Sequence, residues 1–106
     1  RNAIRADKEN EAAWLDLSET HHFLTGIPEA LNILHEAEEV LDAENAMIAY
    51  RKAALFFEAG KNQEAVSQLL TGLSINAELY TSIYSYNKEL ENNEIIQEIV
   101  TMFLNQ

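Results

Sequence analysis

Residues 46–76, AMIAYRKAALFFEAGKNQEAVSQLLTGLSIN, decide the fold of this chain. In the first half of the stretch, small residues and phenylalanine recur every three or four positions, which places them on one face of a helix: Ala49, Ala53 and Phe56. Gly60 lies where that helix must stop, because glycine adopts the left-handed backbone of helix ends at little cost. Apolar residues then return at helical spacing. The stretch therefore predicts two antiparallel helices joined by a tight turn at residues 59–62.

The composition of the chain limits its partners. Its 106 residues are enough for one domain, and 47% of them are apolar. Asp and Glu number 18 against 7 Lys and Arg, which gives a formal net charge of −11. That charge disfavours nucleic acid and anionic membranes and favours a neutral to basic protein or peptide. The sequence has no Cys for a disulfide framework. No export signal is visible, so a cytoplasmic location is the default expectation.

Weaker copies of the central hairpin occur before and after it. When residues 11–44 are laid over residues 46–79, the offset is 35, Thr25 meets Gly60 with Gly26 one position later, and Glu29-Ala30 meets Glu64-Ala65. We therefore expect four parts in one domain: the end of a preceding unit over 1–10, with a linking turn at Lys8-Glu9-Asn10, full units over 11–45 and 46–78, and a degenerate capping pair over 79–106.

The repeated residues resemble the tetratricopeptide repeat. The likeness is carried by Trp14-Leu15-Asp16-Leu17-Ser18, Thr25-Gly26-Ile27-Pro28-Glu29-Ala30 and Ala37, and again by Ala53, Phe56, Gly60, Glu64-Ala65, Leu69 and Leu73. The departures from the family pattern are Lys8, Asp42 and Ala77 in place of the closing proline, His21 in place of an aromatic residue, and Gly72 in place of alanine.

The resemblance implies an all-α fold, an α-solenoid of antiparallel hairpins with about six helices, and a non-catalytic scaffold that binds another protein. Because the chain starts at Arg1 and its first residues look like the tail of a helix, we expect a C-terminal fragment of a longer bacterial-type tetratricopeptide protein.

The C-terminal part predicts two further helices. An apolar stripe indicates a helix over about 77–91, and the cluster Glu91-Asn92-Asn93 indicates a turn. A last amphipathic helix follows, with its apolar positions at Ile95, Ile96, Ile99, Val100, Phe103 and Leu104. Such a pair covers the apolar edge of a repeat array.

Signs of catalysis are missing from the sequence. It contains no Gly-rich phosphate loop, no Cys-His pair and no metal-ligand spacing of recognised form. The adjacent His21 and His22 point about 100° apart on a helix, so the two side chains cannot coordinate the same metal ion. We expect no catalytic residues, no cofactor and no metal.

The resemblance also implies where a partner binds, because the first helix of each tetratricopeptide unit lines the concave side of the array. Helical spacing then selects eight groove residues: Leu15, Glu19, His22, Tyr50, Ala54, Phe57, Tyr84 and Lys88. The alternative for Tyr50 and Phe57 is that they pack against the next unit. Two other functions stay open, namely self-association into a homodimer through the terminal helices, and regulation of a longer enzyme.

Overall fold

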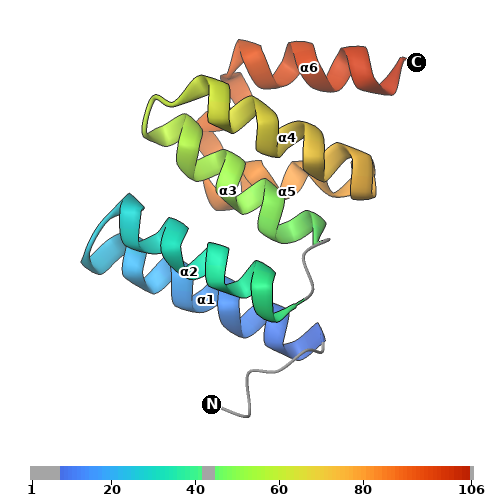
Figure 1. Ribbon diagram of the computed structural model, residues 1–106. Coiled ribbons are helices and arrows are strands. Elements are labelled where there is room, and N and C mark those ends of the chain that lie inside the picture. Colours follow the sequence, from blue (N-terminus) through green and yellow to red (C-terminus); the bar gives the residue numbers. More distant parts are fainter. Residues whose placement is uncertain (1–7, 42–44, 106) are drawn as a thin grey trace.

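The computed structural model describes residues 8–41 and 45–105, and within these ranges the regular structure is entirely helical. The predicted all-α class is therefore confirmed. The first hairpin consists of α1 (Lys8–Leu24) and α2 (Ile27–Val40), and the second of α3 (Ala46–Glu58) and α4 (Asn62–Asn76). The C-terminal segment consists of η1 (Ala77–Thr81), α5 (Ser82–Tyr86), η2 (Lys88–Asn92) and α6 (Glu94–Leu104). In Figure 1 the two hairpins lie side by side with α2 against α3, and α6 runs beside α4.

The central hairpin has the bounds that its sequence predicts. Helix α3 ends at Glu58, and Gly60 follows with φ of 80°, in the left-handed region. The Lys61 N–H donates to the Phe56 carbonyl at 2.9 Å, which satisfies one of the free carbonyls at the end of α3. A side chain at position 60 would meet no other atom, so it is the backbone conformation that favours glycine there.

Two predicted boundaries are wrong. Residues Lys8-Glu9-Asn10, expected as a linking turn, are the first residues of α1. The helix expected over 77–91 is divided at Asn87, whose backbone is extended with φ of −140° and ψ of 99°. The Asn87 side chain accepts a hydrogen bond from the Glu89 N–H, because asparagine amides compete with the helix for nearby backbone groups. The expected tail of a preceding unit, residues 1–7, lies outside the described residues.

The buried apolar side chains form two clusters. The first cluster joins α1 and α2 to the Ile48 and Leu55 side chains of α3. The second cluster joins the rest of α3 to α4 and the C-terminal segment, with Ile83, Leu90 and Ile96 among its members. Tyr86 packs against both clusters, so this one side chain from the C-terminal segment reaches the first hairpin as well as the second.

Helix α3 is the central element of the described structure. Packed against it are α4, α2 and α5. As a result α3 is buried around most of its circumference, and its buried positions include every residue from Lys52 to Leu55. This arrangement decides which of the predicted groove residues can reach solvent.

Candidate functional site

Half of the predicted groove residues lie in the protein core. Leu15, Tyr50, Ala54 and Phe57 are all buried, so the structure does not give them the exposure that a groove residue needs. The physical reason is the packing around α3: a spacing argument assumes one packed face, whereas α2, α4 and α5 all pack against α3. Tyr50 is fully buried, and its hydroxyl donates to the Asn76 carbonyl at 2.8 Å. Burial raises the pKa of Tyr50 to about 12.

The other four predicted residues keep access to the surface but do not form one groove. Tyr84 and Lys88 line a shallow hollow of about 400 Å³ on the C-terminal segment. Burial raises the pKa of Tyr84, and the carboxylate of Glu91 contributes to the same shift. His22 lines a different hollow, near the turns of the hairpins. Glu19 is partly exposed on α1; burial lowers the pKa of Arg51, and the nearby Glu19 carboxylate opposes that shift.

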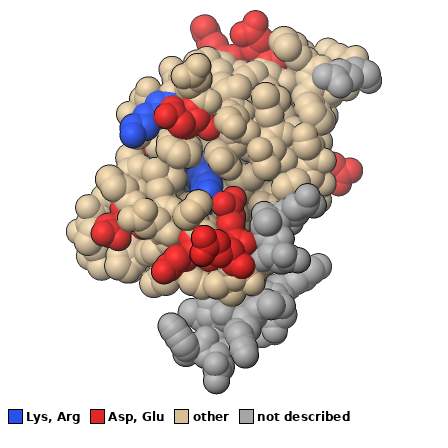
Figure 2. All heavy atoms as spheres, viewed as in Figure 1, with Lys and Arg blue, Asp and Glu red and all other residues tan. Residues whose placement is uncertain are grey.

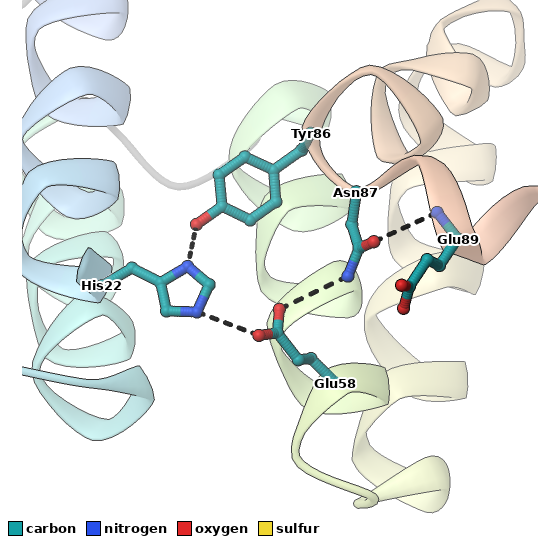
Figure 3. Close-up of polar contacts among 5 residues, drawn as sticks. All are labelled: His22, Glu58, Tyr86, Asn87 and Glu89. Atoms are coloured by element: carbon teal, nitrogen blue, oxygen red, sulfur yellow. Dashed lines mark hydrogen bonds and ion pairs between the residues drawn. The ribbon is translucent and has the colours of Figure 1, made fainter.

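His22 is the centre of a polar junction between three parts of the chain (Figure 3). Its Nδ1 contacts the hydroxyl of Tyr86 from α5, and its Nε2 lies 3.2 Å from Oε2 of Glu58 on α3. The second carboxylate oxygen of Glu58 accepts from the Asn87 amide at 3.4 Å. We name these four residues, together with Arg51, the polar junction. It joins α1 and α3 to the C-terminal segment.

The donors and acceptors of the polar junction match. A carboxylate can only accept, so Nε2 of a neutral His22 carries the proton toward Glu58, and Nδ1 accepts from the Tyr86 hydroxyl. Side-chain exposure of His22 is only 16%. Because an unpaired buried polar group costs free energy, these matched contacts hold the imidazole ring in one position.

Arg51 completes the polar junction on the other side of Tyr86. Its guanidinium lies 3.9 Å from the centre of the Tyr86 ring, the geometry of a cation–π contact. It also donates to the Leu15 carbonyl of α1 at 3.2 Å. Burial lowers the pKa of Arg51, and it raises the pKa of Tyr86 to about 12 although the nearby guanidinium opposes that rise. Tyr86 is thus held on its face by α3 and at its hydroxyl by α1.

A second feature lies beside the polar junction. A hollow of about 520 Å³ opens between the turns of the two hairpins, and we name it the turn hollow; it is lined by His22, Gly26, Ile27, Pro28, Leu31, Ala59 and Lys61. Most of these residues are apolar. Phe23 and Leu24, which lie between His22 and Gly26 in the sequence, are 79% and 74% exposed. The Phe23 ring stacks with the His22 ring of the lining, with 5.8 Å between the ring centres. Large apolar side chains exposed beside an apolar hollow are typical of interaction sites.

The charged side chains leave much of the visible surface uncharged. On the face shown in Figure 2, Lys and Arg atoms appear only beside acidic side chains, and wide areas carry neither charge. Across the part of the chain that the structure describes, no three His, Asp or Glu residues gather closely enough to hold a metal ion. In the same part, none of the helices has the length and hydropathy needed to cross a membrane.

Comparisons with protein-family models, with curated proteins and with solved structures find no match to this chain. The candidate site is therefore defined by its geometry alone.

Sequence reasoning missed most of this site. It selected His22 but not its partners, because Glu58 and Tyr86 are 36 and 64 residues away and only the fold brings them together. The turn hollow had a weak local signal: Phe23 and Leu24 are two consecutive large apolar residues directly before a turn, where polar residues are usual.

Proposed function

We propose that this chain is a non-catalytic protein–protein interaction module of the tetratricopeptide type, and that it binds an apolar segment of another protein in the turn hollow. The observation that carries the proposal is the turn hollow itself, with the exposed Phe23 and Leu24 beside it. Burying such side chains against a partner removes apolar surface from water, which contributes about 25 cal/mol for each Å².

The charge of the chain adds a preference for what flanks the apolar segment. A net charge of −11 attracts basic sequences, does not oppose neutral ones, and repels nucleic acid and anionic membranes. We therefore propose that the partner segment combines one or two large apolar anchors with neutral or basic neighbours. The anchors supply most of the affinity, and the charges mainly raise the rate of encounter.

The test is a selection of peptides from a displayed random library on the purified chain, followed by binding measurements at low and high salt. We expect selected peptides to share an apolar anchor, and Phe23→Ser with Leu24→Ser to weaken their binding at least tenfold. The matched control is Leu70→Ser, which changes an exposed apolar residue on α4 that does not line the turn hollow. Equal binding by the double variant and the control would contradict the proposal.

Self-association is a second candidate, favoured by the exposed apolar side chains of α6. Met102 is 63% exposed and Leu104 is 53% exposed. Two copies that pair through these residues would form a dimer with the same patch on both sides. Sedimentation velocity across a concentration series decides this point. A dimer that is lost in Met102→Ser would support the pairing, and a monomer at all concentrations would exclude it.

A further inference from the structure

The polar junction and the turn hollow share one residue. His22 lines the turn hollow, and its ring is held by Glu58 and Tyr86. Figure 3 shows how these groups converge: the His22 ring extends from α1 toward Tyr86 on one side and Glu58 on the other.

The turn hollow spans the boundary between the two hairpins. Gly26, Ile27, Pro28 and Leu31 come from the first hairpin, whereas Ala59 and Lys61 come from the second. The width of the hollow thus depends on the spacing between the two hairpin turns. Near the hairpin turns, the His22 side chain of the first hairpin contacts the Glu58 side chain of the second.

Tyr86 ties this spacing to the C-terminal segment. The division of the expected helix at Asn87 leaves Tyr86 as the last residue of α5, packed against the clusters of both hairpins. Its ring lies against Arg51 of α3, and its hydroxyl reaches His22 of α1. One side chain from the C-terminal segment thus bridges the first and second hairpins.

From these contacts we infer that the His22–Tyr86 contact is a latch through which the C-terminal segment sets the width of the turn hollow. The inference rests on the proposed function for its biological meaning, because the width matters to a segment that binds there. When the latch is closed, the turn hollow keeps one shape before a partner binds. Binding then costs less conformational entropy. When the latch is open, the first hairpin turns more freely relative to the second.

The lack of Cys in the chain allows a direct measurement of this width. Glu29→Cys and Gln63→Cys place spin labels at exposed positions in the first turns of α2 and α4, next to the lining of the hollow. Pulsed electron–electron double resonance then gives the distribution of distances between the two spin labels. In the Tyr86→Phe variant, which loses only the hydroxyl, we expect a broader distribution with a longer mean distance.

Tyr84→Phe is the matched control, since it removes a hydroxyl from the same helix outside the polar junction. We expect it to leave the distance distribution unchanged. If Tyr86→Phe fails to fold, His22→Phe replaces it, because the phenylalanine ring occupies the place of the imidazole but cannot bond to the Tyr86 hydroxyl. A distribution like that of the unaltered chain in the folded junction variant would overturn the inference.

The peptides selected on the unaltered chain provide a second readout. We expect Tyr86→Phe to weaken their binding about two- to tenfold, the range that corresponds to one net hydrogen bond, and Tyr84→Phe to have no effect. Because the label distances need no partner, the latch can fail while the turn hollow still binds peptides. Equally, the latch can hold while no peptide is selected, which would count against the proposed function alone.

Discussion

The ring of Tyr50 restricts which residue fits at position 72. The ring lies directly over Gly72, so that a β-carbon built at position 72 would come within 2.7 Å of the ring. Gly72 lies inside α4, where alanine would favour the helix more than glycine does. The structure supplies a reason for the glycine: it makes room for a tyrosine that is fully buried and hydrogen-bonded to the Asn76 carbonyl.

Gly72→Ala is therefore expected to destabilise the protein, although alanine favours helices. Overpacking costs about 1–3 kcal/mol and the gain in helix propensity is about 1 kcal/mol, which leaves a net loss of about 1 kcal/mol. Urea unfolding measures the change. In a Tyr50→Leu background the same substitution should cost less, because the ring is gone. A stabilising effect in the unaltered background would mean that Tyr50 does not pack on Gly72.

Tyr50 and the partly buried Tyr86 predict how stability depends on pH. Burial raises the pKa of Tyr50 and of Tyr86 to about 12, whereas an unfolded tyrosine titrates near 10. Above about pH 10 the unfolded state loses these protons first, so the contribution of the two tyrosines to the free energy of unfolding is constant below that pH and falls as the pH rises toward 12. Urea unfolding between pH 8 and 11 should show this fall, and Tyr50→Phe should reduce it. An unchanged pH dependence in Tyr50→Phe would contradict the assignment.

At the scale of the element, the turn of the central hairpin depends on one backbone conformation. Gly60 has φ of 80° and open space around it, so a substitution there tests backbone strain without a steric clash. The C-terminal segment depends on asparagine in a different way. Asn76, Asn87 and Asn93 each accept a backbone N–H two or three residues later, and these caps divide the segment into short helices.

Gly60→Val should destabilise the protein by about 1–3 kcal/mol, because a β-branched residue is strained in the left-handed region. Gly60→Asn is the matched control, since asparagine enters this region more readily, and it should cost less than the valine. Thermal unfolding of the two variants provides the comparison. Equal melting temperatures would mean that the turn does not need the left-handed conformation.

At the scale of the whole molecule, the contact between the two hairpins is both apolar and charged. Ile48 and Leu55 of α3 enter the cluster of the first hairpin, and between them the Lys52 ammonium lies 2.7 Å from Glu38 of α2. Lys52 is the more buried partner, with 8% of its side chain exposed against 24% for Glu38. The pair thus fixes the position of α2 on α3. Because both charges lose part of their hydration, the loss offsets much of the free energy that their attraction contributes.

This asymmetry predicts different effects for the two halves of the pair. Glu38→Ala leaves a buried ammonium without its partner and should cost about 1–3 kcal/mol, less than the full cost of breaking a buried pair because Glu38 is partly solvated. Lys52→Met leaves Glu38 access to water and should change the free energy of unfolding by less than about 1 kcal/mol. Chemical denaturation compares them. The opposite order would show that Glu38 carries the greater desolvation cost.

The sequence by itself determined the features that depend on near neighbours in the chain. Helical spacing and Gly60 predict α3, the turn and the start of α4, and Glu91-Asn92-Asn93 predicts the start of α6. These succeed because helix periods and turn conformations are properties of a few consecutive residues.

Only the tertiary structure decided which faces are buried and which side chains meet. Tyr50 and Phe57 are core residues because α2, α4 and α5 all pack against α3, which the sequence of α3 alone does not show. His22 meets Tyr86 across 64 residues, and the turn hollow forms where two hairpins lie side by side. Burial and long-range contacts depend on how whole elements pack, and that packing is settled by all their surfaces together.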